Sequence, residues 1–494
     1  MVLKQGDKLY FIGIGGARLS ALAKIYKEKG YAVYGSDRLQ TKKTIELEKM
    51  GIAVDYGHDP SQIGDWIDLV IYTNAVGQDN PQLLMAKERG IPILEGAELL
   101  GLLMREKDYG IAVAGTHGKT TTTAIISLLL MKAGKDPTVV IGGDMKELPG
   151  NHRSGKSPFM VVEACEFRRS FLQLSPKVSV ITNVDWDHPD CFPTAGDVVR
   201  TFQEFIALLP EDGLLILWRD DPHFAELAAA SPVPVCTFGL TPEADWYVPS
   251  FTPSLRLGIE GDLYHHGSIQ GRLKLQVPGR HNLLNALAAI AVVTAAGVPV
   301  SQVLKYITEF YGVKRRFQIK GERGGILVVD DYAHHPSAIT TTLQTARAHF
   351  SGRIWCVFQP HLYSRTKHLM SEFTKAFNSS DIVVLADIFA AREKAPGDVS
   401  SQILATEISK YHPDVRYLGA MTRIKEHLLK QARPGDLVIT MGAGDIWKVG
   451  EEYLKEAPAD EYATACGAAK GSAQINNPQA NDERLSVVQT NETH

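Results

Sequence analysis

Residues 111–123 read Ile111-Ala-Val-Ala-Gly-Thr-His-Gly-Lys-Thr-Thr-Thr-Thr123, and this stretch decides the fold. Its first four residues form a short apolar run, which is typical of a buried strand. A glycine-containing loop follows, and a helical segment from Thr121 to Ala133 comes next. A strand, a glycine loop and a helix in this order predict a parallel α/β sheet with a phosphate site at the loop.

The polar residues of this loop match the parts of a nucleotide site. Backbone amides would surround phosphate oxygens, Lys119 would reach the outer phosphates, and the Thr120 hydroxyl would hold Mg²⁺. The strict pattern has glycine at position 113, where this chain has Val113, so Gly115 makes the turn instead. A chance Gly-Lys-Thr turn is the alternative, and the strand–loop–helix context favours phosphate binding over it.

The rest of the chain repeats the alternation of short apolar strands and helices. We expect an α/β protein of three domains: a Rossmann-like domain over residues 1–105, a central P-loop ATPase-type parallel sheet over 106–312, and a Rossmann-like α/β domain over 313–457. In the first, a strand over Tyr31–Tyr34 is expected to end at Gly35-Ser-Asp37. Residues 458–494 are poor in apolar side chains and are expected to be a disordered tail.

Bulk composition narrows the class of protein. The chain has 494 residues, 44% of them hydrophobic, and a net charge of −4, which argues against a nucleic-acid partner. The longest apolar run, Leu283–Val300, is interrupted by Asn285, Thr294 and Gly297, so we expect a buried helix that ends near Gly297 and no membrane span. Five cysteines without a CxxC pair indicate a reduced, cytoplasmic chain.

A second polar set follows two further predicted strands. Glu163 ends one strand, and Thr182-Asn-Val-Asp-Trp-Asp-His188 follows the next. The carboxyl ends of parallel strands line one crevice, so we expect Glu163 and His188 to share a site with Lys119 and Thr120. These side chains suit Mg²⁺ carried on nucleotide phosphates. For His188 a structural, hydrogen-bonded role is an equal alternative, since imidazole is not a favoured Mg²⁺ ligand.

The first domain carries a second glycine loop. Gly13, Gly15 and Gly16 follow a strand and precede a helix that includes Ser20, and Asp37 follows the next strand. This resembles a dinucleotide fingerprint but is not GxGxxG, because position 18 is arginine. An NAD-dependent oxidoreductase is therefore one alternative. A site for another diphosphate is the other, because both use the same amides at a helix N-terminus.

Together these segments resemble the Mur ligases. The resemblance covers about residues 8–455 and rests on pieces that occur in the same order as in that family. They are Gly13-Ile-Gly-Gly16, Gly115-Thr-His-Gly-Lys-Thr-Thr121, Glu163, Thr182-Asn-Val-Asp-Trp-Asp-His188, Gly279-Arg-His-Asn-Leu-Leu-Asn285, Asp330-Asp-Tyr-Ala-His-His-Pro336 and Phe358-Gln-Pro-His-Leu-Tyr-Ser-Arg365. The resemblance implies an ATP- and Mg²⁺-dependent ligase that joins L-alanine to the carboxylate of UDP-N-acetylmuramate through an acyl phosphate.

The resemblance also implies roles for individual residues. Lys119, Glu163, His188 and His334 would be catalytic, and Thr120, Glu163 and His188 would hold the metal. The nucleotide would contact Gly115, Thr116, His117, Gly118, Lys119, Thr120, Thr121, His281, Asn282, Asn285, Arg316 and Asp331. Asp331, His334 and His335 would line the amino-acid side. The sugar nucleotide would contact Gly13, Gly15, Gly16, Ser20, Asp37 and Arg365.

Some positions depart from the family pattern, and other interpretations stay open. Leu362 and Gly96 stand where arginine is frequent, and Arg18 stands at a usual methionine position, which puts the sugar-nucleotide contacts in question. His334-His335 fits a plain turn before Pro336 as well as a site, and His281-Asn282 also fits a helix start. The rival activities are a ligase that adds a tripeptide to UDP-N-acetylmuramate and a non-catalytic nucleotide-sugar-binding homologue. The oligomeric state is left open.

Overall fold

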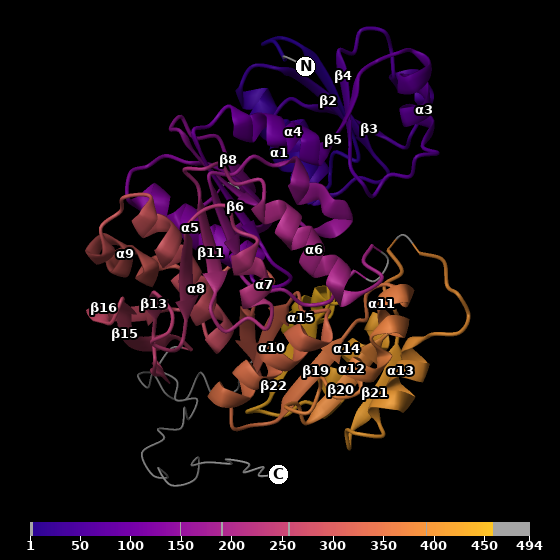
Figure 1. Ribbon diagram of the computed structural model, residues 1–494. Helices are drawn as coiled ribbons and strands as arrows, with labels where there is room; N and C mark the ends of the chain where they lie inside the picture. The colour runs from indigo at the N-terminus through magenta and orange to yellow at the C-terminus, as the bar shows by residue number, and fades with distance from the viewer. Residues whose placement is uncertain (1–2, 149, 189–190, 255–256, 392, 458–494) are drawn as a thin grey trace, which may run out of the picture.

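The structure is a computed structural model, which describes residues 3–148, 150–188, 191–254, 257–391 and 393–457. The predicted disordered tail, residues 458–494, lies outside the described residues. Three sheets follow one another along the chain (Figure 1), and the central sheet lies between the other two. This is the three-domain α/β architecture that the sequence predicts.

The N-terminal sheet has five parallel strands in the order β3-β2-β1-β4-β5. The strands are β1 (Lys8–Ile12), β2 (Ala32–Asp37), β3 (Ala53–Tyr56), β4 (Leu69–Tyr72) and β5 (Ile93–Glu95). The helices are α1 (Ala17–Glu28), α2 (Lys42–Lys49), α3 (Pro81–Glu88) and α4 (Gly96–Arg105), with a 3-10 turn at Pro60–Gln62. The predicted end of β2 at Gly35 is wrong: Gly35 pairs with Phe11 and Val54, so the strand continues to Asp37.

The central sheet is parallel through its middle and antiparallel at its margins. Its strands are β6 (Tyr109–Ala114), β7 (Thr138–Met145), β8 (Gly150–Arg153), β9 (Phe159–Glu163), β10 (Val178–Ile181), β11 (Leu214–Trp218), β12 (Val235–Gly239), β13 (Trp246–Tyr247), β14 (Phe251–Pro253), β15 (Ile259–His265) and β16 (Ser268–Leu275). Parallel pairing runs from β7 through β9, β6, β10, β11 and β12 to β13. The antiparallel β15–β16 hairpin and the β7–β8 pair extend this sheet beyond the purely parallel one expected.

Helices cover both faces of the central sheet. They are α5 (Lys119–Lys132), α6 (Ala195–Ile206), α7 (Phe224–Ala229), α8 (Arg280–Ala295) and α9 (Val300–Tyr306), with 3-10 segments at Phe167–Gln173 and Ile307–Glu309. The apolar run that contains α8 is broken at Gly297, whose φ is +81°, as expected near that glycine. None of the described helices is both long and apolar enough to cross a membrane.

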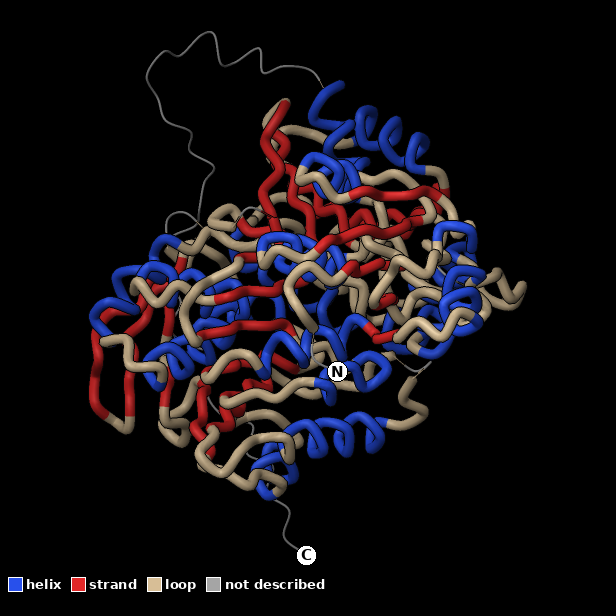
Figure 2. The backbone as a smooth tube through the Cα atoms, turned by 90° about the horizontal axis from the view of Figure 1, so that it is seen from above, coloured by secondary structure: helices blue, strands red, loops and turns tan. Residues whose placement is uncertain are grey.

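The C-terminal sheet has the order β17-β18-β22-β19-β20-β21, parallel except for the β17–β18 pair. Its strands are β17 (Gln318–Arg323), β18 (Ile326–Asp331), β19 (Ile354–Phe358), β20 (Ile382–Ala386), β21 (Val415–Gly419) and β22 (Leu437–Met441). The helices are α10 (Pro336–His349), α11 (Tyr363–His368), α12 (Met370–Phe373), α13 (Ser401–Ile408), α14 (Met421–Gln431) and α15 (Trp447–Glu456). Figure 2 shows the helices lying against the strands of each sheet.

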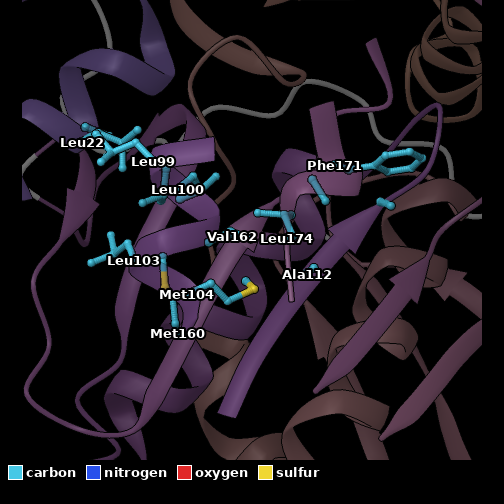
Figure 3. Packing of buried hydrophobic residues seen from close by; sticks show 14 of the residues in the cluster. Leu22, Leu99, Leu100, Leu103, Met104, Ala112, Met160, Val162, Phe171 and Leu174 are labelled. Carbon is cyan, nitrogen blue, oxygen red and sulfur yellow. The ribbon is translucent and has the colours of Figure 1, made fainter. Parts of the chain in front are cut away.

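The N-terminal domain and the central sheet share one hydrophobic core. Leu99 and Leu103 of α4 belong to the same buried cluster as Met160 and Val162 of β9 and Phe171 of the following 3-10 segment (Figure 3). Removing such area from water stabilises the contact by roughly 25 cal/mol per Å². These two parts of the chain are therefore fixed to each other by packing.

The C-terminal domain is attached differently. Its two sheet faces have their own apolar clusters, and Trp186 packs against both the cluster that includes Phe171 and the cluster beneath α10. Beside Trp186 the junction is polar, because His117, Asp185 and Asp187 of the central domain contact side chains of α10 and α11. A polar junction of this kind separates at lower cost than an apolar core, as domain closure requires.

Candidate active site

The loop after β6 has a backbone that requires its two glycines. Gly115 has φ +128° and Gly118 has φ +85°. A Cβ at Gly115 would lie 2.0 Å from Thr182 Oγ1, and one at Gly118 would lie 2.3 Å from Asn285 Oδ1. The loop, residues 115–121, leads directly into α5, which begins at Lys119. The helix N-terminus therefore points its free amides at the space beside the loop, as an anion site requires.

Lys119 is held inside the loop by a buried partner. Its ammonium donates to the carbonyl of Thr116 at 3.0 Å and to Glu166 Oε1 at 3.0 Å, and both side chains are largely buried. Burial alone would lower the pKa of Lys119, but Glu166, with Cys165 and Glu163 in support, raises the pKa above its ordinary value. Glu166 is not among the predicted site residues, although it lies three positions beyond Glu163 at the end of β9.

Thr120 and Glu163 meet as the sequence predicts. Thr120 Oγ1 donates to Glu163 Oε2 at 2.9 Å, and the Gly142 amide donates to the same oxygen at 2.8 Å. A hydroxyl and a carboxylate that converge beside a phosphate loop are oxygen donors of the kind that Mg²⁺ prefers. These two residues therefore fit the metal site expected from the sequence.

His188 lies in the same region, but its ring contacts other groups. The ring packs against that of Phe167 with 4.9 Å between the two centres, and Nε2 lies 3.8 Å from Asp187 Oδ2. Burial lowers the pKa of His188, and this effect prevails over the Asp187 and Glu166 carboxylates, which act in the opposite direction. The imidazole is therefore neutral near pH 7 and carries a lone pair. Its φ of +55° is strained for a residue with a Cβ.

The predicted adenine-side residues lie against the loop. Asn285 Oδ1 accepts from Thr122 Oγ1 at 3.2 Å, and its amide donates to Asn282 Oδ1 at 3.3 Å. Asn282 in turn donates to the carbonyl of Pro278 at 2.7 Å. His281 is half-buried beside Arg316, and loss of solvent contact followed by the Arg316 charge lowers its pKa to about 4. The structure thus brings α8 to the nucleotide loop.

Residues of the C-terminal domain approach from the other side. Asp331 accepts the amides of Phe317 and Ala333, each at 2.7 Å, which fixes the chain around Arg316. The Arg316 guanidinium lies 5.1 Å from the centre of the Tyr332 ring. Burial raises the pKa of Asp331, and Arg316 opposes this rise. The predicted pair of Arg316 and Asp331 therefore forms one unit beside His281.

His334 is half-buried, and its hydrogen-bond partner shows which ring nitrogen carries the hydrogen. Its Nδ1 lies 2.9 Å from the carbonyl of Tyr332, and a carbonyl only accepts, so Nδ1 carries the hydrogen and Nε2 carries the lone pair. Burial and the Arg365 charge hold the pKa of His334 well below its ordinary value. The ring is therefore a neutral acceptor at the domain junction.

Arg365 forms a buried ion pair across the junction. Its Nε and Nη2 donate to Asp187 Oδ1 at 3.1 and 2.9 Å, and the two side chains are 3% and 9% exposed. Burial would raise the pKa of Asp187, but Arg365 together with the neighbouring histidines holds the pKa well below the usual range. Arg365, predicted to contact the substrate, thus has Asp187 as its partner here.

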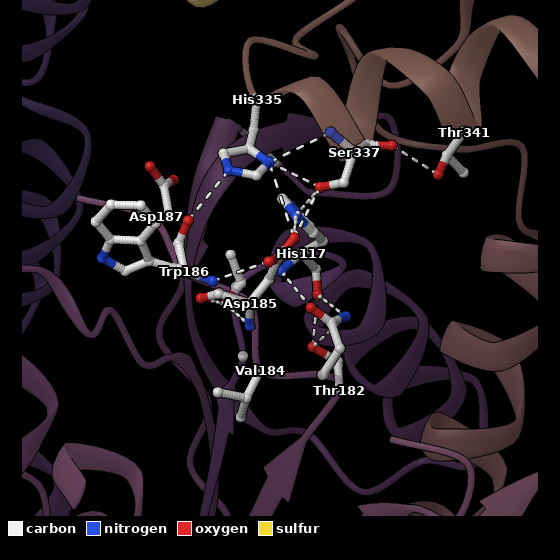
Figure 4. Close-up of polar contacts among 12 residues, drawn as sticks. His117, Thr182, Val184, Asp185, Trp186, Asp187, His335, Ser337 and Thr341 are labelled. Carbon is white, nitrogen blue, oxygen red and sulfur yellow. Dashed lines mark hydrogen bonds and ion pairs between the residues drawn. The ribbon is translucent and has the colours of Figure 1, made fainter. Parts of the chain in front are cut away.

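A second junction cluster joins the phosphate loop to α10 (Figure 4). His117 Nε2 lies 2.9 Å from Ser337 Oγ, and Ser337 Oγ donates to Asp185 Oδ2 at 2.9 Å. His335 Nε2 lies 3.2 Å from the carbonyl of Trp186. The sequence places His117 and His335 in the site but gives no sign that Asp185 and Ser337 join them, because these contacts connect residues far apart in the chain.

The first-domain loop has the geometry expected of a diphosphate site. Gly15 donates its amide to Asp37 Oδ2 at 2.8 Å, and Gly13 has φ +80°. Gly16 precedes α1, whose free amides face the loop. Ser20 is placed differently, because it is fully buried and its hydroxyl donates to the carbonyl of Ala17 in its own helix.

A cavity of about 290 Å³ lies between the N-terminal domain and the central sheet. It is lined by the start of α1, the segment after β4, the middle of β7, the end of β9 and the segment after β9, and its lining includes Arg18, Asn74, Gly96, Gly142, Glu163 and Cys165. Two of the positions that depart from the family pattern, Arg18 and Gly96, therefore face the same space as Glu163. The cavity therefore extends from the start of α1 to Glu163 of the expected metal site.

Three family models match in sequence order. The model described as "Mur ligase family, catalytic domain" matches residues 8–108, "Mur ligase middle domain" matches 113–293, and "Mur ligase, glutamate ligase domain" matches 315–444. The chain belongs to the Mur ligase family.

Curated relatives agree over nearly the whole chain. The chain is 43% identical over 455 residues to the UDP-N-acetylmuramate–L-alanine ligase of Caldanaerobacter subterraneus subsp. tengcongensis, covering 92% of this chain and 98% of that protein. It is 44% identical over 449 residues to the enzyme of the same name from Acetivibrio thermocellus, covering 91% and 96%. The solved structure of the UDP-N-acetylmuramate-alanine ligase MurC from Thermotoga maritima matches with a TM-score of 0.77 and 31% identity, covering 93% of this chain and all of that chain.

Proposed function

We propose that this chain is an ATP-dependent ligase that joins L-alanine to the carboxylate of UDP-N-acetylmuramate and releases ADP and phosphate. The observation that carries the proposal is the contact of Thr120 with Glu163 next to Lys119 of the phosphate loop, where Glu163 also lines the cavity that reaches the start of α1. Identity of 43–44% to relatives named for this reaction supports the choice of substrates.

The first chemical step is phosphoryl transfer from ATP to the muramate carboxylate. A carboxylate is a poor electrophile, because oxide would have to leave; an acyl phosphate offers phosphate as the leaving group. ATP and the carboxylate are both anions, so positive charge and amide donors must offset their repulsion. In our proposal the positive charge comes from Lys119 and Arg316, and the amide donors are those at the start of α5. When ATP binds, Lys119 leaves Glu166 and contacts the phosphates instead.

Mg²⁺ belongs to the proposal because the donor set fits it. Thr120 and Glu163 would hold the ion, with His188 as the third predicted ligand. Once bound, the ion would supply positive charge at the transferring phosphate.

The second step is attack by the amine of L-alanine on the acyl phosphate. The C–N bond forms, the C–O bond to phosphate breaks, and the amine gives up a proton. His334 is the proposed acceptor of that proton, because its Nε2 bears the lone pair and its depressed pKa keeps the ring neutral at pH 7. Gly13, Gly15, Gly16 and Asp37 are proposed to hold the UDP diphosphate.

A phosphate-release assay tests the proposal. Purified protein is supplied with ATP, Mg²⁺ and UDP-N-acetylmuramate, and then with L-alanine, glycine, L-serine or the tripeptide of the rival ligase. We expect release that depends on both the sugar nucleotide and L-alanine, with the ligated product identified by mass. Release with the tripeptide and none with L-alanine would assign the chain to the tripeptide-adding activity instead.

A further inference from the structure

The cluster of His117, Asp185 and His335 has ligand atoms that converge from two domains. His117 belongs to the phosphate loop, Asp185 follows β10, and His335 caps α10 of the C-terminal domain. Asp185 Oδ2 lies 3.5 Å from His117 Nε2 and 3.9 Å from His335 Nδ1. All three ligand atoms lie within 4.8 Å of one another. Ligands bonded to a tetrahedral zinc ion at about 2.0 Å are separated by roughly 3.3 Å, so small side-chain movements would complete a site.

The tautomer of His335 places a lone pair on the nitrogen that the site requires, where it accepts from the Ser337 amide at 3.4 Å. Its Nε2 faces the carbonyl of Trp186 at 3.2 Å, and a carbonyl only accepts, so the hydrogen lies on Nε2 and the lone pair on Nδ1. That lone pair faces the cluster (Figure 4). A backbone carbonyl that fixes a histidine in this way is the usual outer partner of a metal-bound imidazole.

One hydroxyl oxygen lies among the three ligand atoms. Ser337 Oγ lies 2.9 Å from His117 Nε2, 2.7 Å from His335 Nδ1 and 2.9 Å from Asp185 Oδ2. The hydroxyl donates its one hydrogen to Asp185 Oδ2, and His335 Nδ1 accepts from the Ser337 amide at 3.4 Å. The three ligand atoms thus surround a point that holds one oxygen atom and would suit a cation.

We propose that His117, Asp185 and His335 form a binding site for a divalent transition-metal ion of the zinc class, separate from the Mg²⁺ site at Thr120 and Glu163. Two imidazoles and one carboxylate are the ligand types that zinc takes. The His117 and Asp185 side chains are 31% and 42% exposed, which gives the ion a path from solvent. Ser337 would turn its hydroxyl aside by rotation about χ1.

A bound ion would tie the phosphate loop to the C-terminal domain. Ligands from both domains must be in place together, so the ion binds the closed arrangement and stabilises it by mass action. A rise in the melting temperature with added Zn²⁺ is therefore expected from the wild-type protein.

Calorimetric titration tests the site. The full chain, freed of metal with a chelator and saturated with Mg²⁺, is titrated with Zn²⁺ alone. We expect one equivalent to bind, with affinity at least tenfold weaker in Asp185→Asn and in His335→Gln. Ser337→Ala should bind at least as tightly as wild type, because it removes the hydroxyl that fills the point. His368→Gln, an exposed histidine of α11 outside the cluster, is the matched control and should leave the affinity unchanged.

Equal affinity in wild type and Asp185→Asn, or no binding by wild type, would overturn the proposal. Should the variants not fold, crystals of the wild-type protein grown with Zn²⁺ decide the matter by anomalous scattering. A peak bonded to His117, Asp185 and His335 supports the site. Peaks elsewhere, or none, reject it.

Discussion

At the scale of single residues, the buried pair of Lys119 and Glu166 links stability to activity. Lys119→Met should reduce ATP-dependent phosphate release roughly 10²–10³-fold, the usual loss for an electrostatic donor to a transition state. It also leaves Glu166 buried without its partner, and removing one partner of such a pair costs about 3–5 kcal/mol. Steady-state kinetics and urea unfolding measure the two effects.

The double variant Lys119→Met/Glu166→Gln separates the loss of activity from the loss of stability. It should recover much of the lost stability, because no lone buried charge remains, and it should stay as inactive as the single variant. Activity close to wild type in either variant would remove Lys119 from the proposed site.

His281 makes a pH-dependent contribution to stability. Its pKa in the folded protein is about 4, below the ordinary value of 6.5, so the unfolded chain binds more protons between these values. Its contribution is present above pH 6.5 and is lost as the pH falls toward 4, amounting to about 3 kcal/mol in all. Urea unfolding at pH 7.5 and 5.0 should show a smaller pH dependence in His281→Asn than in wild type; the same dependence in both would contradict the shift.

Single residues also mark the limit of what a sequence predicts. Thr120, Glu163 and Asn285 meet the loop as predicted, because each lies at the end of a strand or start of a helix whose place follows from a parallel sheet. The role of Glu166 could not be predicted, because no feature of the sequence around it indicates that Lys119 is its partner. The pairing of Asp187 with Arg365 could not be predicted either, because it depends on how two domains pack against each other.

At the scale of elements, the phosphate loop depends on its glycine backbone. Gly118→Ala adds a Cβ at φ +85° that would lie 2.3 Å from Asn285 Oδ1, so we expect weaker ATP binding and a stability loss of about 1–3 kcal/mol. Fluorescence titration with a labelled ATP analogue and urea unfolding measure both.

Gly134→Ala is the matched control for this change. Gly134 follows α5 with φ +73°, and a Cβ at this position would meet nothing within 4 Å, so the variant carries the backbone strain without the clash. We expect a loss of stability without a loss of ATP binding. Equal loss of binding in both variants would attribute the effect to global unfolding.

The positions of the central strands can be predicted from apolar runs in the sequence. The strands at the edges of the sheets and the ends of strands cannot. Strands such as β19 and β20 are continuous apolar runs between helices, so pattern alone locates them. The β15–β16 hairpin is harder to predict, because β16 contains no continuous apolar run and leaves Arg272 and Lys274 exposed. The continuation of β2 past Gly35 is unexpected because glycine usually interrupts a strand, whereas here Phe11 and Ile14 pack where a side chain would be.

At the scale of the whole molecule, closure depends on the ion pair of Arg365 and Asp187. Arg365→Met leaves Asp187 as a lone buried charge, so water must reach it and the closed arrangement is disfavoured. We expect a larger radius of gyration by small-angle scattering and reduced turnover. The control is Arg353→Met, which removes a partner of Asp436 within the C-terminal domain and should lower stability without changing the radius. An unchanged radius in Arg365→Met would show that the pair does not govern closure.

We propose residues 1–105, 106–312 and 313–457 as the functional units of the chain, moving with unequal freedom. The shared core of α4, β9 and Phe171 favours motion of the third unit against the first two together. The polar junction around Trp186 is where that motion is expected.

The shared core has a consequence for how the polypeptide is made. While the ribosome has delivered only the first hundred or so residues, Leu99 and Leu103 of α4 lack the surface they cover in the finished protein, because β9 and Phe171 are still to be synthesised. The nascent N-terminal segment therefore presents an apolar stripe to chaperones until translation passes about residue 174. The third unit, residues 313–457, has its own apolar cores, so it does not need the preceding segments to cover them.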